Sequence, residues 1–218
     1  MIYEPAELYA LLDSLLAKEW AGFYEDRSRP VPFFVDCPDE SLAEWVSQGR
    51  IHSGTALDIG CGNGRNSRFL ASQGFTVTGV DLDSTAIQWA QEQGGDYVCG
   101  SVFDLPLGTY DLIFDSGCFH HLPPHRRKEY VQLIARRLRP GGYFGLTCFR
   151  PEGGSGLTDR EVYERWTLGG GLGYTEEQLR AIWSRELEIL ELRPMGEVEG
   201  LFGKDFLWVM LAQANEPQ

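Results

Sequence analysis

Short apolar runs and amphipathic segments alternate along most of the chain. Runs of strand length occur at residues 55–60, 75–81, 96–100, 110–116, 143–149, 186–192 and 205–212. Segments with apolar residues at helical spacing separate most of these runs, which predicts βαβ units and a parallel sheet. Only residues 193–204 separate the last two runs, too few for a helical crossover, so we expect these two strands to pair antiparallel.

The helical segments carry recognisable start signals. Helices are predicted over residues 4–20, after Pro38, over 64–73, from a cap at Ser84, from Pro123 and Pro124 to Leu138, over 158–166 and from residue 175. Thr158 with Glu161, and Thr175 with Gln178, have the spacing of capping boxes. The first helix has a leucine stripe with interleaved acids and no basic leader, so we interpret it as amphipathic and not as a signal peptide.

The length of 218 residues suits one domain. We divide it into N-terminal helices with a candidate lid (1–50), a ligand-binding core (51–149), an insertion that is a candidate substrate lid (150–174), and a C-terminal helix with the last strands (175–218). Hydrophobic residues make up 43% and charged residues 23%, as in ordinary globular proteins.

Composition excludes several classes of partner. No run of about 18 apolar residues occurs, which predicts no membrane span. The net charge of −13 disfavours nucleic acid, because phosphate backbones repel an acidic chain. Five dispersed cysteines without a CxxC pair predict neither a disulfide framework nor a zinc site, and they favour a cytoplasmic location.

A glycine-rich turn is the strongest chemical signal. The strand that begins at Thr55 leads into Gly60-Cys61-Gly62-Asn63-Gly64, and a helix follows at once. Glycines permit a tight turn and let a ligand approach the backbone, and ligands of open α/β sheets bind at the carboxyl ends of the strands. Without further context, such a turn is also compatible with an ordinary strand-to-helix connection.

Two acidic residues near the turn indicate which kind of ligand it could bind. Asp81 ends the next strand, where a carboxylate can accept hydrogen bonds from both hydroxyls of a ribose; a helix-capping role is the alternative. Asp58 lies two residues before Gly60. A carboxylate there would repel the pyrophosphate of a nicotinamide cofactor, whereas it suits a positively charged amino acid moiety, directly or through water. The alternative for Asp58 is a buried residue bonded to backbone amides.

The order of these motifs resembles that of class I S-adenosylmethionine-dependent methyltransferases over residues 55–149. ALDIGCGNGRNSRFLASQGFTVTGVDLD is similar to their first two motifs, SVFDLP to the third, YDLIFDSGCFHHLPP to the fourth, and LRPGGYFGL to the segment after it. The resemblance implies a Rossmann-like, doubly wound α/β fold. Its mostly parallel seven-stranded sheet would have an antiparallel last strand and helices on both faces.

The same resemblance implies a set of ligands for S-adenosyl-L-methionine. The glycine turn and Asp58 would shape the methionine site, Asp81 would hold the ribose, and Asp104 would meet the adenine. The predicted cofactor-binding residues are Asp58, Gly60, Cys61, Gly62, Gly64, Asn66, Asp81, Leu82, Val102, Phe103, Asp104, Asp115 and Ser116.

A pair of histidines follows the fourth strand. His120 and His121 are candidate general bases, because histidine titrates near neutrality; alternatively, one packs under the loop and the other is solvated. Together with His125, these histidines do not form a metal site. Two prolines between them break any helical spacing, and no acidic residue or cysteine is adjacent. Soft acceptors need little help from a base, so the chemistry does not require one.

The acceptor side is less defined. GRNSRFLASQG is similar to the tellurite-resistance and thiopurine methyltransferases, which act on small, often soft acceptors and whose N-terminal arm closes over the cofactor. Residues 20–34 are the equivalent candidate here, with Arg27 and Arg29 able to grip an anion or simply to lie on the surface. Tyr163, Trp166 and Tyr174 of the insertion form either an aromatic wall or a plug at the sheet edge.

These observations predict methyl transfer from S-adenosylmethionine to a small-molecule acceptor, with a sulfur or chalcogen nucleophile as the finer expectation. Two other functions stay open at this point. One is a non-catalytic module that binds S-adenosylmethionine. The other is a nicotinamide-dependent reductase, which Asp58 disfavours.

Overall fold

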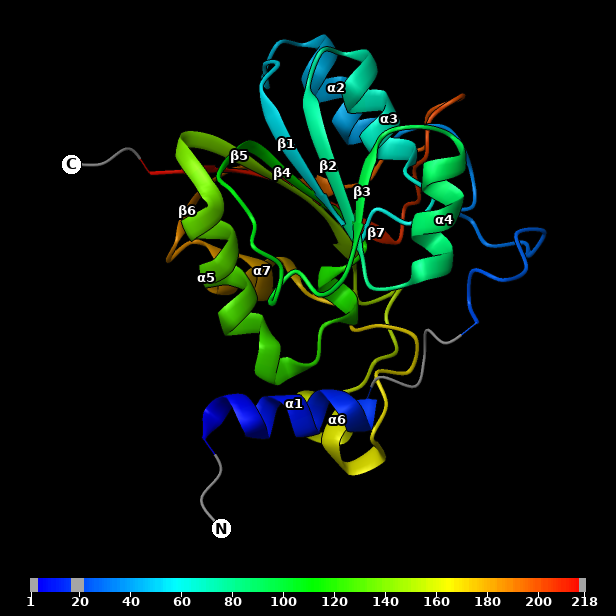
Figure 1. The fold of residues 1–218 in the computed structure, drawn as a ribbon. Coiled ribbons are helices and arrows are strands. Elements are labelled where there is room, and N and C mark those ends of the chain that lie inside the picture. Colours follow the sequence, from blue (N-terminus) through cyan, green and yellow to red (C-terminus); the bar gives the residue numbers. More distant parts are fainter. Residues whose placement is uncertain (1–3, 17–21, 216–218) are drawn as a thin grey trace.

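Seven strands form a single sheet in the order β3-β2-β1-β4-β5-β7-β6 (Figure 1). The computed structural model describes residues 4–16 and 22–215. All neighbouring strands pair parallel except β5 with β7 and β6 with β7, so the predicted doubly wound architecture and the antiparallel last strand are confirmed. The strands are β1 (Thr55–Ile59), β2 (Thr76–Asp81), β3 (Asp96–Cys99), β4 (Tyr110–Ser116), β5 (Leu138–Phe149), β6 (Leu187–Pro194) and β7 (Leu207–Ala214).

Within the described residues, seven helices surround the sheet. They are α1 (Pro5–Leu16), α2 (Glu40–Ser47), α3 (Arg65–Ser72), α4 (Ser84–Glu92), α5 (Arg127–Arg137), α6 (Asp159–Arg165) and α7 (Glu176–Trp183). Of these, α1 and α6 lie beyond one end of the strands and the others cover the two faces of the sheet (Figure 1). Two short 3-10 turns, η2 (Phe119–His121) and η3 (Pro124–Arg126), precede α5. Within residues 4–16 and 22–215, no helix combines the length and apolar character needed to cross a bilayer.

The strand pattern explains why two cores form. In β4, Ile113 belongs to the core beneath α5 and α7, while its neighbours Leu112 and Phe114 belong to the core beneath α2 and α3. Side chains of a strand alternate between faces, so a continuous apolar run is buried on both sides. Gly145 of β5 permits this packing, because a Cβ there would lie 2.7 Å from atoms of both Trp45 and Phe114.

Several element boundaries differ from the predicted ones. Asp83, and not Ser84, caps α4: its Oδ1 accepts from the N–H groups of Thr85 (2.7 Å) and Ala86 (3.0 Å). Residues 17–20 of the first predicted helix lie outside the described residues. Helix α5 begins only at Arg127, after the two 3-10 turns. Both predicted capping boxes are confirmed.

Strand β5 is also longer than predicted. Leu138 pairs with Tyr110, but the next pair is Tyr143 with Leu112, so an irregularity separates the two pairings. The segment RPGG was expected only to end the helix; it also forms this bulge, where Gly141 has a φ of +73°.

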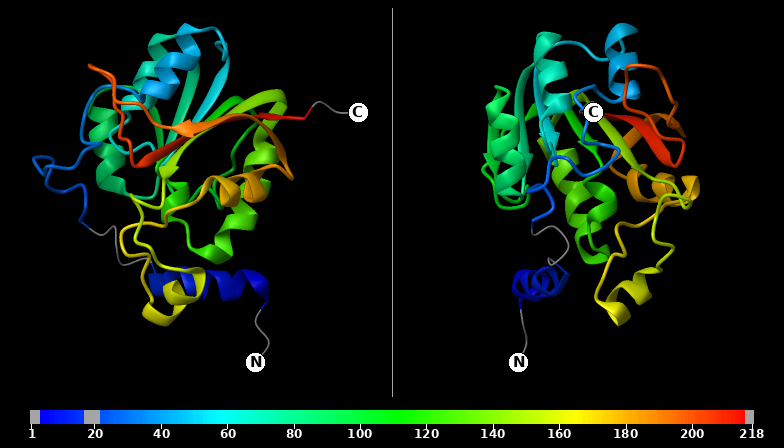
Figure 2. Two further views of the ribbon diagram at one scale, coloured as in Figure 1. Left: turned by 180° about the vertical axis from the view of Figure 1, so that it is seen from behind. Right: turned by 90° about the vertical axis from the view of Figure 1, so that its right-hand side faces the viewer.

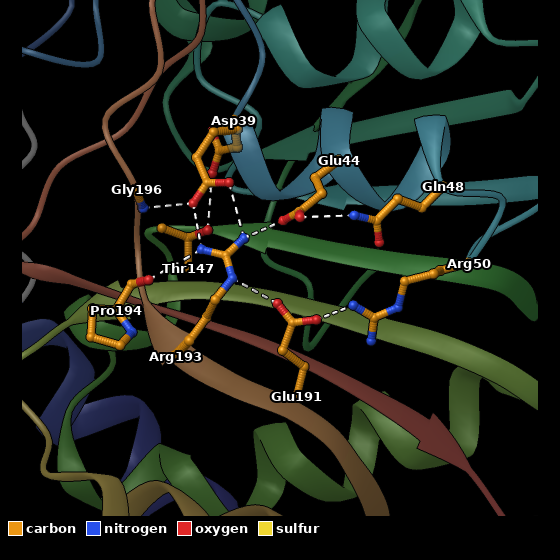
Figure 3. Close-up of polar contacts among 10 residues, drawn as sticks. Asp39, Glu44, Gln48, Arg50, Thr147, Glu191, Arg193, Pro194 and Gly196 are labelled. Carbon is orange, nitrogen blue, oxygen red and sulfur yellow. Dashed lines mark hydrogen bonds and ion pairs between the residues drawn. The ribbon is translucent and has the colours of Figure 1, made fainter.

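An ion-pair network attaches α2 to the edge strand β6 (Figure 3). The guanidinium of Arg193 contacts Glu40 (2.6 Å), Glu44 (2.6 Å) and Glu191 (2.8 Å), and Arg50 also pairs with Glu191. Because Glu40 is buried, this contact fixes the position at which the N-terminal segment enters α2.

The residue before α2 anchors that segment more deeply. Asp39 is fully buried, and its Oδ1 lies 2.5 Å from Nη1 of Arg65. Its Oδ2 accepts hydrogen bonds from the hydroxyls of Ser116 (2.8 Å) and Thr147 (2.9 Å). Asn66 donates to Oδ1 through Nδ2 (3.2 Å). The N-terminal segment is therefore tied to the start of α3 and to the carboxyl ends of β4 and β5.

We predict that Asp39→Ala destabilises the protein by about 3–5 kcal/mol, because it leaves the buried guanidinium of Arg65 unpaired. Asp36→Ala is the matched control: Asp36 also pairs with an arginine, Arg68, but its side chain is 80% exposed, so the expected loss is below about 1 kcal/mol. Chemical denaturation measures both values. Similar losses for the two variants would contradict the anchoring role.

Candidate functional site

The candidate site lies where β1, β2 and β4 end. Strand β1 pairs with β2 on one side and with β4 on the other, so the chain changes direction across the sheet at this point. Such a switch point leaves a crevice outside the carboxyl ends of the strands, where open α/β sheets bind ligands. Helices α1 and α6 lie at the same end of the molecule in every view (Figures 1 and 2).

The glycine turn follows β1 directly. Backbone N–H groups of Gly60 and Cys61 donate to the carbonyl of Val80 (2.8 and 3.0 Å). Gly60, Gly62 and Gly64 have φ values of +66°, +54° and +79°, a region that favours glycine. A Cβ on Gly60 would also lie 2.9 Å from the Cβ of Cys118. The turn therefore needs glycine for its conformation and for its close contacts.

Asp81 is positioned at the turn by two backbone groups. Its Oδ2 accepts from the N–H of Gly62 (2.9 Å), and its Oδ1 accepts from the N–H of Asp83 (2.9 Å). Burial raises the pKa of Asp81. Because Asp83 caps α4, the capping alternative for Asp81 does not apply. Leu82, another predicted ligand, is 70% exposed beside it.

Asp58 is buried beneath the turn, and its Oδ2 accepts from the hydroxyl of Ser67 (2.6 Å). Burial raises the pKa of Asp58 to about 7. The partner is thus a side chain of α3 and not the loop amides that the alternative proposed. Cys61 packs in a small cluster with Ile87, Ala90 and Tyr97.

Two other predicted ligands are engaged with Asp39. Asn66 accepts from the Asp39 N–H through Oδ1 (3.0 Å) and donates to the Asp39 carboxylate through Nδ2. The Ser116 hydroxyl donates to the same carboxylate and accepts from Nη2 of Arg65 (3.1 Å). These contacts give both residues a role in holding the N-terminal segment.

The predicted adenine segment follows β3. Val102 is buried in the core, Phe103 is partly buried, and Asp104 is exposed. The ring of Phe103 lies edge-on to Tyr130 (6.2 Å) and beneath the guanidinium of Arg126 (4.8 Å).

Asp115 organises the loop after β4. Its carboxylate accepts from the N–H groups of Cys118 (2.7 Å) and Phe119 (3.0 Å) and from the hydroxyl of Tyr130 (2.5 Å). Burial raises the pKa of Asp115 to about 7, although the three donors act in the opposite direction. This fully buried carboxylate shapes the loop that carries the two histidines.

His120 and His121 have different surroundings. Nδ1 of His120 accepts from the N–H of Phe149 (3.2 Å), and the imidazole stacks on the Phe149 ring at 3.7 Å. Burial lowers the pKa of His120 well below 6.5. His121 is half-buried, and burial lowers its pKa to about 4. His120 therefore holds the loop against β5, whereas His121 is the more accessible of the two.

Helices α1 and α6 meet at His125. Its Nε2 lies 2.9 Å from Asp13 of α1, and its Nδ1 lies 2.8 Å from the hydroxyl of Tyr163 of α6. Tyr163 also contacts Trp166 edge-on. Tyr174 does not join them: it is buried against Phe119 (5.1 Å). Tyr163 and Trp166 therefore form a pair near the surface, whereas Tyr174 is part of the core, so the three residues do not form one aromatic wall.

The N-terminal arm, residues 22–39, packs against the turn. Asn63 donates to the carbonyl of Val35 (3.1 Å), and Arg65 donates to the carbonyl of Cys37 (3.2 Å). Arg27 pairs with Glu92 of α4 (2.5 Å), and Arg29 donates to the carbonyl of Phe23 (3.2 Å). Both arginines are exposed and act within the arm or toward α4, as the surface alternative proposed.

Two residues of this region escaped sequence reasoning. Asp39 carries no motif, and its contacts with Ser116 and Thr147 span 77 and 108 positions. Tyr24, which lies over the turn, is one of several aromatic residues in the arm. The cluster of aromatic residues at 23–34 was the only available signal, and it did not single out Tyr24.

The charges at the turn fit an S-adenosylmethionine site. Asp58, Asp81 and Asp115 surround it, and the buried arginine beside it, Arg65, is already paired with Asp39. This acidic environment favours a ligand with cationic groups and disfavours a pyrophosphate. Residues 4–16 and 22–215 contain no group of three or more His, Cys, Asp or Glu side chains that could hold a metal ion.

Comparison with known proteins agrees with this geometry. Residues 56–142 match the family model described as a methyltransferase domain. The chain is 34% identical over 176 residues to the 2-heptyl-1-hydroxyquinolin-4(1H)-one methyltransferase of Mycobacteroides abscessus, a match that covers 77% of this chain and 72% of the relative. It is 33% identical to the fatty-acid O-methyltransferase of Mycolicibacterium smegmatis over 49% of this chain and 41% of that protein.

A solved structure extends the similarity to the whole fold. The N-methyltransferase NodS from Bradyrhizobium japonicum in complex with S-adenosyl-L-homocysteine superposes with a TM-score of 0.66. It covers 90% of this chain and 98% of NodS at 16% identity. The family model and the relative from Mycobacteroides abscessus set aside the nicotinamide-dependent and non-catalytic alternatives. The chain belongs to the class I S-adenosylmethionine-dependent methyltransferases, and it is an enzyme that uses S-adenosyl-L-methionine as its cofactor.

Proposed function

We propose that this enzyme methylates a small molecule at a soft or already ionised atom, with a thiolate or another chalcogen anion as the favoured acceptor. The single observation that carries this proposal is that burial lowers the pKa of both histidines at the site. Neither has a pKa near neutrality, so a protonated, weakly acidic acceptor would find no histidine suited to removing its proton.

The other titratable groups at the turn support the same conclusion. Asp58 and Asp115 have pKa values raised to about 7, but both are buried and hydrogen-bonded within the protein. Both ring nitrogens of His125 are engaged with Asp13 and Tyr163. Among the described residues of this edge, binding and alignment are therefore the main means of catalysis.

The cofactor residues follow from the same geometry. When bound, S-adenosylmethionine supplies a methyl group that its sulfonium has already activated. We assign the ribose hydroxyls to Asp81, the adenine amino group to Asp104 with Phe103 beneath the ring, and the methionine portion to the glycine turn. Asp58, Asn66, Asp115 and Ser116 support this site from below by fixing α3, the loop after β4 and the N-terminal arm.

The acceptor side has a mixed lining. His121 lies on the loop after β4, Tyr163 lies in α6, and Trp166 follows the last residue of that helix. These side chains favour a molecule with an apolar or aromatic body. The names of the relatives from Mycobacteroides abscessus and Mycolicibacterium smegmatis, a heptylquinolone and a fatty-acid enzyme, support an acceptor of this kind.

We predict that Asp104→Asn weakens S-adenosylhomocysteine binding about tenfold, because it removes a charged acceptor from the adenine. Asp81→Asn is expected to weaken it at least as much. Asp96→Asn is the control, since Asp96 is an exposed residue at the start of β3 and not at its carboxyl end. Titration calorimetry measures all three. Unchanged affinity for Asp104→Asn would refute the adenine assignment.

A second prediction concerns pH. Because the pKa of His121 is about 4, this residue is neutral above about pH 5 and contributes no titration between about pH 6 and 8. The rate with thiol acceptors should then rise about tenfold per pH unit up to the pKa of the thiol itself. Two thiols of different pKa should give correspondingly different midpoints in kcat/KM profiles.

His121→Asn is the matched variant for this measurement. It is expected to keep both profiles, because the acceptor and not the histidine titrates. A midpoint near pH 6.5 that both thiols share, and that disappears in His121→Asn, would instead establish the general-base role that the sequence suggested for this histidine.

A further inference from the structure

We infer that Tyr24 of the N-terminal arm is a second ligand of the cofactor ribose, donating a hydrogen bond to a hydroxyl whose proton Asp81 accepts. This inference rests on the proposed placement of the ribose at Asp81. It gives the arm a specific chemical role in cofactor binding.

The position of the Tyr24 hydroxyl is the first observation. A Cβ placed on Gly62 would lie 3.3 Å from Oη of Tyr24, so the hydroxyl contacts the middle glycine of the turn. The N–H of the same glycine donates to Oδ2 of Asp81 (2.9 Å). Tyr24, Gly62 and Asp81 therefore meet at one point, on the turn that a ligand must approach.

The ring of Tyr24 is held in a defined orientation. It is 7% exposed and packs between Phe23 (5.3 Å, edge-on) and Phe34 (5.5 Å, stacked). Phe34 in turn lies edge-on to Trp89 of α4 at 5.1 Å. Because aromatic contacts on both sides fix the ring, little conformational entropy remains to be lost when the hydroxyl binds a ligand.

The chemistry of the hydroxyl matches that of a ribose. Among residues 4–16 and 22–215, the Tyr24 hydroxyl has no hydrogen-bond partner. Burial raises its pKa well above 10, and the charge of Asp81 adds to this effect, so the group is a neutral donor. A ribose hydroxyl both donates and accepts; a carboxylate only accepts. Asp81 and Tyr24 together satisfy both functions of one hydroxyl.

The test compares S-adenosylhomocysteine with its 2′-deoxy and 3′-deoxy analogues by titration calorimetry on the full chain. Tyr24→Phe keeps the ring and removes only the hydroxyl. We expect this variant to bind S-adenosylhomocysteine roughly five- to tenfold more weakly. Its preference for S-adenosylhomocysteine over one of the deoxy analogues should fall by the same factor. Tyr143→Phe is the matched control, because Tyr143 lies within β5 and away from the carboxyl end of that strand at Phe149.

Each other outcome overturns the inference in a recognisable way. Equal weakening for all three ligands, with the preference retained, would assign Tyr24 a purely structural role. Tighter binding by Tyr24→Phe would mean that the hydroxyl opposes the cofactor. If the wild-type protein binds all three ligands equally, or if Asp81→Asn keeps the full preference, the proposed ribose placement at Asp81 fails, and this inference fails with it.

Discussion

The buried ion pair between Asp39 and Arg65 holds four parts of the molecule together. Asp39 precedes α2, Arg65 begins α3, and the carboxylate also accepts from Ser116 and Thr147 at the ends of β4 and β5. The guanidinium lies over the ring of Phe202 at 4.3 Å. Charges removed from water are stable only when every partner is in place, so these segments must adopt one arrangement together.

That arrangement brings the N-terminal arm and the glycine turn together at the proposed cofactor site. Arg65 follows the last glycine of the turn, and its hydrogen bond to the carbonyl of Cys37 ties the N-terminal arm to the turn. The carboxyl groups beneath and beside the turn, and a guanidinium that is already paired with Asp39, suit a ligand with sulfonium and ammonium groups better than a pyrophosphate. The loop after β4 is held by Asp115, and burial lowers the pKa of both histidines that this loop carries.

Local patterns predicted most of the fold and the conformation of the glycine turn. The glycine turn, Asp81, the two capping boxes and the antiparallel last strand all depend on residues close in sequence or on strand spacing. Asp39 and Tyr24 do not. Asp39 stands at the cap position of α2 but makes no side-chain cap hydrogen bond; its partners come from elsewhere in the fold. Sequence spacing also could not show that Asn66 and Ser116 bind Asp39, or that Tyr174 is buried away from Tyr163 and Trp166, because these contacts join residues far apart in the chain.

The central claim is that the N-terminal arm and the glycine turn form one cofactor site. Hydrogen exchange of the wild-type protein, with and without S-adenosylhomocysteine, tests it most directly. We expect the cofactor product to slow exchange in residues 22–39 together with residues 58–66 and 81–83. Slowed exchange in the turn and at the end of β2, with the arm unchanged, would contradict the claim and would leave the arm as packing alone.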